Sequence, residues 1–248
     1  MLDINKILQQ PVERKFRLWH VPISGLVVGL FAALVIGQIA PLFSMPAELG
    51  QMPLQPSPEY LSRYNAAHRQ MFCGNYATYF AIVGGLIGLA AGIVGARRNW
   101  LVSLMATSLS GALAGMIGGY LLGMGVAVCI QGNISESMNF IGIPIEPIVQ
   151  TTALQCFIWS MIGMATGSSL TVANSGLARI AKGIEGGLAG GLVAGTINSL
   201  VVATFYSLSN AFLVVPETLS QRIIWASIGG LCINFGLIRG LVKPKQVQ

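Results

Sequence analysis

The sequence reads GALAGMIGGYLLG at residues 111–123 and GIEGGLAGGLVAG at residues 183–195. In both stretches glycine recurs at every fourth position, so these glycines share one face of a helix. A helix face without side chains lets the backbone of another helix approach closely. In lipid there is no hydrophobic drive to pair helices, and van der Waals contact at such faces holds them together instead. The two stretches therefore predict helices that pack tightly inside a membrane.

Glycine at this spacing occurs in four hydrophobic runs of the chain, and these glycines are the predicted helix-packing residues. They are Gly25, Gly29, Gly84, Gly88, Gly92, Gly111, Gly115, Gly119, Gly123, Gly183, Gly187, Gly191 and Gly195. The run at 183–209 also carries Gly186 and Gly190, so we expect it to lie centrally between two neighbouring helices. Packing within the protein's own bundle is the favoured interpretation, and pairing with a helix of another protein is the alternative.

The composition excludes a soluble globular domain. Of the 248 residues, 54% are hydrophobic and 9% are charged, and the mean hydropathy is +0.70. Soluble domains carry about 25% charged residues. A bilayer, by contrast, covers an apolar surface directly. We therefore expect most of this chain to be surrounded by lipid.

Six runs are long enough to cross the roughly 30 Å of hydrocarbon in a bilayer. They cover residues 23–43, 76–95, 101–130, 148–171, 183–209 and 223–242. The predicted fold class is an all-α polytopic membrane protein, a glycine-rich bundle of about six transmembrane helices. We expect residues 1–22 to form a basic cytoplasmic segment suited to the membrane interface, 23–242 the transmembrane domain, and 243–248 a cytoplasmic tail.

Positive charges orient these spans, because Lys and Arg in short loops stay on the cytoplasmic side. With the N-terminus inside, 11 of the 14 lie on that side: Lys6, Arg14, Lys15, Arg17, Arg97, Arg98, Arg179, Lys182, Arg239, Lys243 and Lys245. Arg63, Arg69 and Arg222 fall outside. Both termini are therefore predicted to be cytoplasmic. The net charge of +6 is a topology signal, and nucleic acid is not an expected partner.

The outer loop at residues 44–75 is the one long connection in this topology. Ser57 followed by Pro58 predicts an N-cap and a first helical position. Tyr60 and Tyr64 then recur at helical spacing. We therefore predict a short amphipathic helix on the outer surface.

A shift of 75 residues aligns the second and third runs with the fourth and fifth. It places Ile87, Gly88, Gly111 and Gly115 on Ile162, Gly163, Gly186 and Gly190. A weaker similarity links Trp159 in the fourth run to Trp225 in the sixth. One interpretation is true duplication, with up to three helical hairpins in the same orientation. The other is bias from abundant glycine and alanine.

Candidate chemical groups are few and lie apart. Glu185 is the one carboxylate inside a run, and it lies close to Lys182, where an ion pair or a first helical turn accounts for it. The two histidines, His20 and His68, fall on opposite sides of the membrane. Nucleotide-binding, zinc-protease and serine-hydrolase motifs are absent from the sequence. We therefore predict no catalytic residue, metal ligand or cofactor site.

Two cysteines and three polar residues leave alternatives open. Cys73 and Cys129 both lie at the outer ends of runs, so they are either a candidate disulfide or two free thiols. Thr107, Gln155 and Asn198 lie within spans. They either line a path for a neutral solute or hydrogen-bond between helices and to nearby carbonyl groups.

These features favour a non-enzymatic structural or assembly subunit of a larger membrane complex. The expected partners are the lipid bilayer and either other membrane-protein subunits or further copies of this chain. The alternative function, from another class, is a channel or facilitator for a small uncharged solute.

Overall fold

Long apolar segments fold as long helices, because a helix satisfies its backbone hydrogen bonds within one segment. The structure is a computed structural model that describes residues 20–50, 53–95, 100–131, 139–140, 143–144, 147–175, 177–205, 214–216 and 218–241. Its helices are α2 (His20–Ile39), α3 (Pro58–Gly95), α4 (Trp100–Gln131), α5 (Pro147–Ser175), α6 (Ile180–Phe205) and α7 (Leu219–Leu241). The 3-10 helices η1 (Ala47–Leu49) and η2 (Leu177–Arg179) and the antiparallel strands β1 (Asn139–Phe140) and β2 (Ile143–Pro144) complete the described elements.

The helices confirm the helical, multi-pass membrane class. Among the described residues, the five helices α3 to α7 are long and apolar enough to cross a membrane. The apolar part of α2 covers only Ile23–Ile39, about 26 Å of helix. The corresponding run was predicted to continue to residue 43. The helix ends earlier because Pro41 disfavours a helical conformation at the residue before it.

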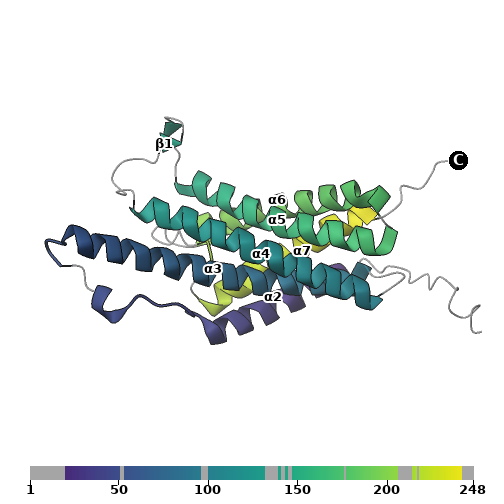
Figure 1. Cartoon of the computed structure of the whole chain (residues 1–248). Helices are drawn as coiled ribbons and strands as arrows, with labels where there is room; N and C mark the ends of the chain where they lie inside the picture. Colours follow the sequence, from purple (N-terminus) through teal and green to yellow (C-terminus); the bar gives the residue numbers. More distant parts are fainter. Residues whose placement is uncertain are drawn as a thin grey trace, which may run out of the picture.

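The predicted outer helix and the second predicted span are one continuous helix, α3. Its first turn is capped as predicted, since the amide N of Tyr60 donates to Ser57 Oγ at 3.1 Å and Pro58 is the first helical residue. No break separates this turn from residue 76. The expectation of a separate helix lying on the outer surface is therefore wrong. In Figure 1, α3 extends beyond the other helices at the end where it begins.

A stripe of aromatic rings accounts for this continuity. Tyr60, Tyr64, His68, Phe72 and Tyr76 follow one another at four-residue spacing, with neighbouring ring centroids between 4.5 and 6.2 Å apart. Contacts between side chains four residues apart stabilise a helix, and aromatic pairs add to this. The stripe therefore carries the helix from the outer segment into the span.

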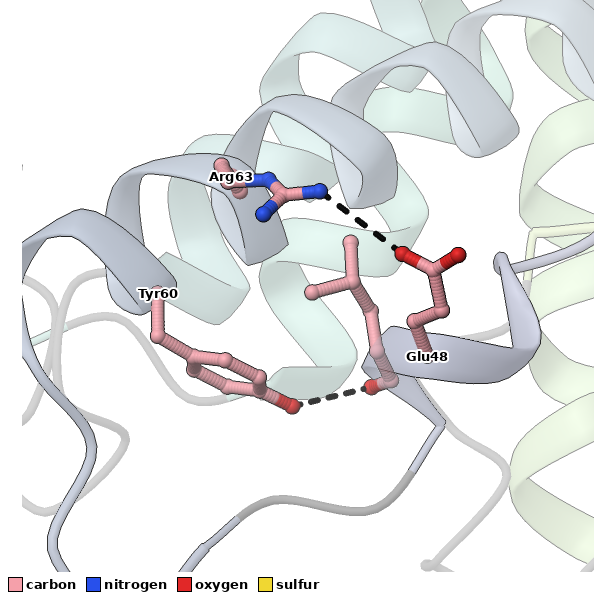
Figure 2. A network of polar contacts seen from close by, with 4 residues as sticks. Glu48, Tyr60 and Arg63 are labelled. Atoms are coloured by element: carbon pink, nitrogen blue, oxygen red, sulfur yellow. Dashed lines mark hydrogen bonds and ion pairs between the residues drawn. The ribbon is translucent and has the colours of Figure 1, made fainter.

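The 3-10 helix η1 packs against the first turns of α3. The hydroxyl of Tyr60 donates to the carbonyl O of Leu49 at 3.2 Å, and Arg63 forms an ion pair with Glu48 at 3.7 Å (Figure 2). The ion pair is largely exposed to solvent, so it contributes little stability. The buried side chain of Leu49 is the main anchor of this segment.

The six helices form a closed ring in chain order, and α7 returns to pack against α2. The helices α3, α5 and α7 also contact one another, so they are the inner helices. The other three, α2, α4 and α6, lie outside and fill the gaps between them. We call the end at which α3, α5 and α7 begin the loop end. The opposite end is called the basic end, because Arg179 and Lys182 lie there.

Four glycines of α4 lie against the backbone of α3. A Cβ added to Gly111 would fall on the carbonyl O of Gly84, and one added to Gly115 would fall on the carbonyl O of Phe80. Four other predicted packing glycines of this pair also meet the backbone of the partner helix: Gly88, Gly92, Gly119 and Gly123. Glycine is required at these positions because no space exists for a side chain.

The pair formed by α5 and α6 has contacts of the same kind. A Cβ on Gly163 would meet the carbonyl O of Gly187, and Gly191 and Gly195 lie against the backbone of α5 at Ser160 and Cys156. The close pair of the first hairpin, Gly84 with Gly111, corresponds to Gly163 with Gly187 in the second. The corresponding residues are 79 apart on α3 and α5 but 76 apart on α4 and α6. One ungapped shift of 75 residues therefore does not reproduce the contact register.

The second groove of α6 faces α7. A Cβ on Gly236 would fall on the carbonyl O of Gly186, and one on Gly190 would lie 2.6 Å from the carbonyl O of Cys232. The helix α6 therefore lies between α5 and α7, although on the outside of the bundle. On the other side of α7, Gly25 and Gly29 of α2 lie against its backbone.

The outer surface of the bundle is apolar. On α4 the exposed large side chains are Trp100, Leu101, Val102, Met105, Leu109, Leu113, Met116, Ile117, Tyr120 and Leu121. A soluble protein does not expose a continuous apolar patch of this extent. Contact with a lipid bilayer accounts for it.

Candidate functional site

Three aromatic rings meet at the centre of the inner helices. Phe80 of α3, Trp159 of α5 and Trp225 of α7 have ring centroids 6.1, 5.3 and 5.0 Å apart, pair by pair. All three side chains are almost completely buried. The rings meet edge to face or tilted, which is the favoured arrangement for aromatic pairs. We call these three residues together with Gln155 the central cluster.

Gln155 connects the central cluster by hydrogen bonds. Its Oε1 accepts from Trp159 Nε1 at 2.9 Å and from Trp225 Nε1 at 3.3 Å. Its Nε2 donates to the carbonyl O of Val214 at 2.7 Å. The side chain is fully buried, where an unpaired indole N–H would be costly. The amide group suits this position because its oxygen accepts from both indoles while its nitrogen donates to the carbonyl.

The other two residues of the predicted polar path bond elsewhere. Thr107 Oγ1 donates to the carbonyl O of Ser103 at 2.6 Å, within its own helix α4. Asn198 Nδ2 donates to the carbonyl O of Trp225 at 3.2 Å, across the contact of α6 with α7. Both bonds are of the kind expected if these residues hydrogen-bond between helices or to nearby carbonyl groups, and not of a solute path.

The three polar residues do not share one path. Thr107 lies opposite Gly88 of α3. Gly88 is eight residues from Phe80, which is about 12 Å along the helix axis. The structure therefore brings Gln155 to the indole of Trp225 and Asn198 to its backbone carbonyl, but leaves Thr107 in another layer of the bundle.

A second buried amide, Asn75, secures the segment after α2. Its Oδ1 accepts from the backbone N of Leu42 at 3.1 Å and of Phe43 at 3.0 Å, and its Nδ2 donates to the carbonyl O of Phe43 at 2.8 Å. Asn75 therefore holds the bend at Leu42 and Phe43 through both residues' backbone groups. Like Gln155, it ties an irregular segment at the loop end to an inner helix.

Cys73 is a free thiol, buried where α3 meets Gly123 of α4. The disulfide with Cys129 is therefore not formed. Cys129 is six residues beyond Gly123 on α4, about 9 Å along the axis, which exceeds the usual Cα separation of a disulfide. The side chain of Cys129 itself lies outside the described residues.

Glu185 is exposed on α6, near the basic end. Within the described part of the chain the ion pair found joins Arg63 to Glu48, and Glu185 is not paired with Lys182. The helix begins at Ile180, earlier than the predicted span, so Glu185 falls in its second turn and outside the first. Neither the ion pair nor the first-turn position expected from the sequence applies. The carboxylate of Glu185 is exposed, so water can solvate its charge.

Charged and metal-binding side chains do not gather in the described residues. No group of three His, Cys, Asp or Glu side chains is found among them. His20 lies at the start of α2 near the basic end, whereas His68 lies toward the loop end of α3. The groups buried near the centre are neutral amides, hydroxyls and indoles, which can hydrogen-bond but do not supply a charged acid or base at neutral pH.

The sequence pointed to part of this site. Gln155 was identified as a polar residue in a span, and Trp159 and Trp225 were matched by the weaker internal similarity. Phe80, Asn75 and Val214 were missed. A comparison of the chain with family models, with curated proteins and with solved structures gives no match.

Proposed function

We propose that the protein is a closed, non-enzymatic bundle that serves as a structural or assembly subunit of a larger membrane complex. The observation that carries this proposal is the central cluster. Three interlocking aromatic rings and a glutamine with three hydrogen bonds occupy the place where a transporter would need a path. Close backbone contact at Gly84, Gly115 and Gly187 keeps the surrounding helices in place.

In this proposal all six helices, including α2, span the bilayer. Trp100 and Tyr120 are exposed on α4 and lie 20 residues apart, about 30 Å along a helix. That distance equals the hydrocarbon thickness, and aromatic residues favour both interfaces. The loop end then faces outward and both termini face the cytoplasm, as the positive charges predict.

The proposed contact surface for partner subunits is the projecting part of α3. Tyr76 lies beside Gly119 of α4, one residue from Tyr120, so residues 58–75 extend beyond the hydrocarbon. The segment 44–50 packs on this projection. Partner subunits or further copies of the chain would bind there, outside the lipid.

The similar glycine contacts in the pair α3 and α4 and in the pair α5 and α6 support a proposed duplication. Phe80 and Trp159 precede Gly84 and Gly163 by four residues, and both rings point into the central cluster. Relative to the shift of 75, a duplication would require an offset of four residues on the first helix of the hairpin and of one residue on the second. Trp225 supplies the third ring from the pair formed by α7 and α2.

The alternative function, a facilitator for a small uncharged solute, is favoured by one observation. Asn198 Oδ1, Ser160 Oγ and Thr166 Oγ1 are buried without a hydrogen-bond partner within the described structure. Such acceptors are available to a neutral solute. Ser160 and Thr166 lie on α5, and Asn198 lies on α6.

Native mass spectrometry of gently solubilised protein tests the proposed function. We expect defined complexes that contain other membrane proteins, released only under conditions that also break their mutual contacts. A lone monomer or a closed homo-oligomer across mild detergents would contradict the assembly role and favour the facilitator.

A further inference from the structure

A short segment before α7 enters the bundle. Val214 is fully buried and Val215 is 6% exposed, whereas Leu219, the first residue of α7, is 46% exposed. Pro216 is also buried. The residues just before α7 are therefore more buried than the first residue of the helix itself. We call residues 214–216 the strap.

Two side chains from different helices hold the backbone of the strap. Gln155 Nε2 donates to the carbonyl O of Val214 at 2.7 Å, and Arg222 Nε donates to the carbonyl O of Pro216 at 2.7 Å. Gln155 is eight residues inside α5, about 12 Å from its first residue. Irregular backbone at such depth is stable only when it is buried in protein with its polar groups bonded. Pro216 has no backbone N–H to satisfy.

Gln155 links the strap directly to the central cluster. The same amide that donates to Val214 accepts from Trp159 and Trp225. Val214 also belongs to the hydrophobic core that contains Phe80 and both tryptophans. Losing the glutamine amide would therefore leave the carbonyl O of Val214 and two indole N–H groups without their hydrogen-bond partner at the same time.

We propose that the strap is a plug that closes the loop end of the central cluster, and that Gln155 is the latch that holds it there. With the latch intact, water is excluded from the rings. With the latch broken, the strap opens and the loop-end half of the cluster becomes wet. This proposal rests on the closed bundle of the proposed function and names the device that closes it. It also explains Arg222, a positive charge on the predicted outer side, as the second hold on the plug.

Thiol accessibility in proteoliposomes tests the latch. Val215→Cys and Thr218→Cys are each introduced beside the native cysteines, and labelling by a membrane-impermeant maleimide is read at each site by peptide mass spectrometry. The backgrounds are Gln155, Gln155→Leu and the matched control Asn198→Leu, which removes a buried amide whose hydrogen bond goes to the carbonyl O of Trp225.

With Gln155 present or with Asn198→Leu, Val215→Cys should react slowly. In Gln155→Leu its rate should rise at least about tenfold, because a buried segment that loses its hydrogen bond opens more often. Thr218→Cys, at an exposed position, should react quickly in all three backgrounds.

A second variant, Arg222→Met, removes the other hold without entering the core, and we expect a rise of about threefold. If Gln155→Leu does not fold, this variant decides the question. Rapid reaction of Val215→Cys with both holds intact would overturn the plug. Slow reaction in folded Gln155→Leu, with altered tryptophan fluorescence, would overturn the latch. Solute flux through the unmodified protein would contradict the proposed function instead, and the labelling result would still stand by itself.

Discussion

Ser57 shows how one side chain determines where a helix begins. Its Oγ accepts from the amide N of Tyr60 at 3.1 Å, and Pro58 occupies the first helical position, where its lack of an N–H costs nothing. This first turn is exposed and projects from the bundle, so few other contacts hold it. The cap therefore decides the local stability of the projection.

We predict that Ser57→Ala destabilises the first turn of α3 by about 1 kcal/mol without unfolding the protein. Hydrogen exchange of the Tyr60 and Leu61 amides should become about fivefold faster. Ser62→Ala, at an exposed serine one turn later, is the control and should leave both rates unchanged. Equal exchange in Ser57→Ala and the parent would show that the cap does not hold the turn.

Ser57 and Gln155 together show which single residues can be identified from the sequence. The motif at Ser57 is local, because the donor lies three residues from the acceptor. Gln155 and the carbonyl O of Val214 lie 59 residues apart. Only the packing of α5 beside the strap brings them together. Asn75 and Arg222 escaped detection for the same reason, since their partners are backbone atoms of irregular segments.

Glycine faces determine how neighbouring helices approach. Gly115 lies directly against the carbonyl O of Phe80, whereas Gly125, on the same helix α4, has nothing within 4 Å of an added Cβ. Substituting each of these two glycines distinguishes the effect of contact with the partner helix from the intrinsic effect of glycine on helix stability. A difference between them must come from the partner helix.

We predict that Gly115→Leu lowers stability by about 3 kcal/mol or more, because a branched side chain would hold α3 away from α4. The midpoint of thermal unfolding should fall by about 6–12 °C. Gly187→Leu should behave similarly, because it faces the carbonyl O of Gly163. Gly125→Leu should remain within about 3 °C of the parent. Loss of stability in Gly125→Leu equal to that in Gly115→Leu would refute a specific contact.

The periodicity of the sequence predicted the helices better than it predicted their partners. Five predicted spans overlap α3 to α7, because apolar length alone defines a membrane helix. Their ends differ by a few residues, except that α3 begins at Pro58 and its predicted span at residue 76. The continuity of α3 was missed because Tyr60 to Tyr76 was divided into a surface helix and a span. The return of α7 to α2 was not predicted, since contacts between chain ends leave no mark in local spacing.

The apolar belt on α4 gives the whole bundle a position relative to the bilayer. Between Trp100 and Tyr120 the exposed side chains are large and apolar. The projecting turns of α3, with the exposed Arg63 and Arg69, lie beyond one boundary of this belt. The exposed Arg179 and Lys182 lie near the other boundary. The proposed orientation places the first group outside and the second in the cytoplasm.

Cysteines at three exposed positions test that orientation. Ala47→Cys and Thr218→Cys at the loop end should be labelled from outside intact cells by an impermeant thiol reagent. Leu177→Cys at the basic end should be labelled only after the membrane is permeabilised. Labelling of Leu177→Cys alone in intact cells would mean that the bundle is inverted.

The central claim is that the bundle is closed, and solute flux through purified protein in liposomes tests it most directly. Vesicles that contain the protein should be no more permeable to water, glycerol or urea than empty vesicles, because the central cluster leaves no polar path. Asn198→Leu and Thr107→Leu serve as controls, and neither should change the flux. A protein-dependent flux that Asn198→Leu or Thr107→Leu abolishes would contradict the closed bundle and establish a facilitator.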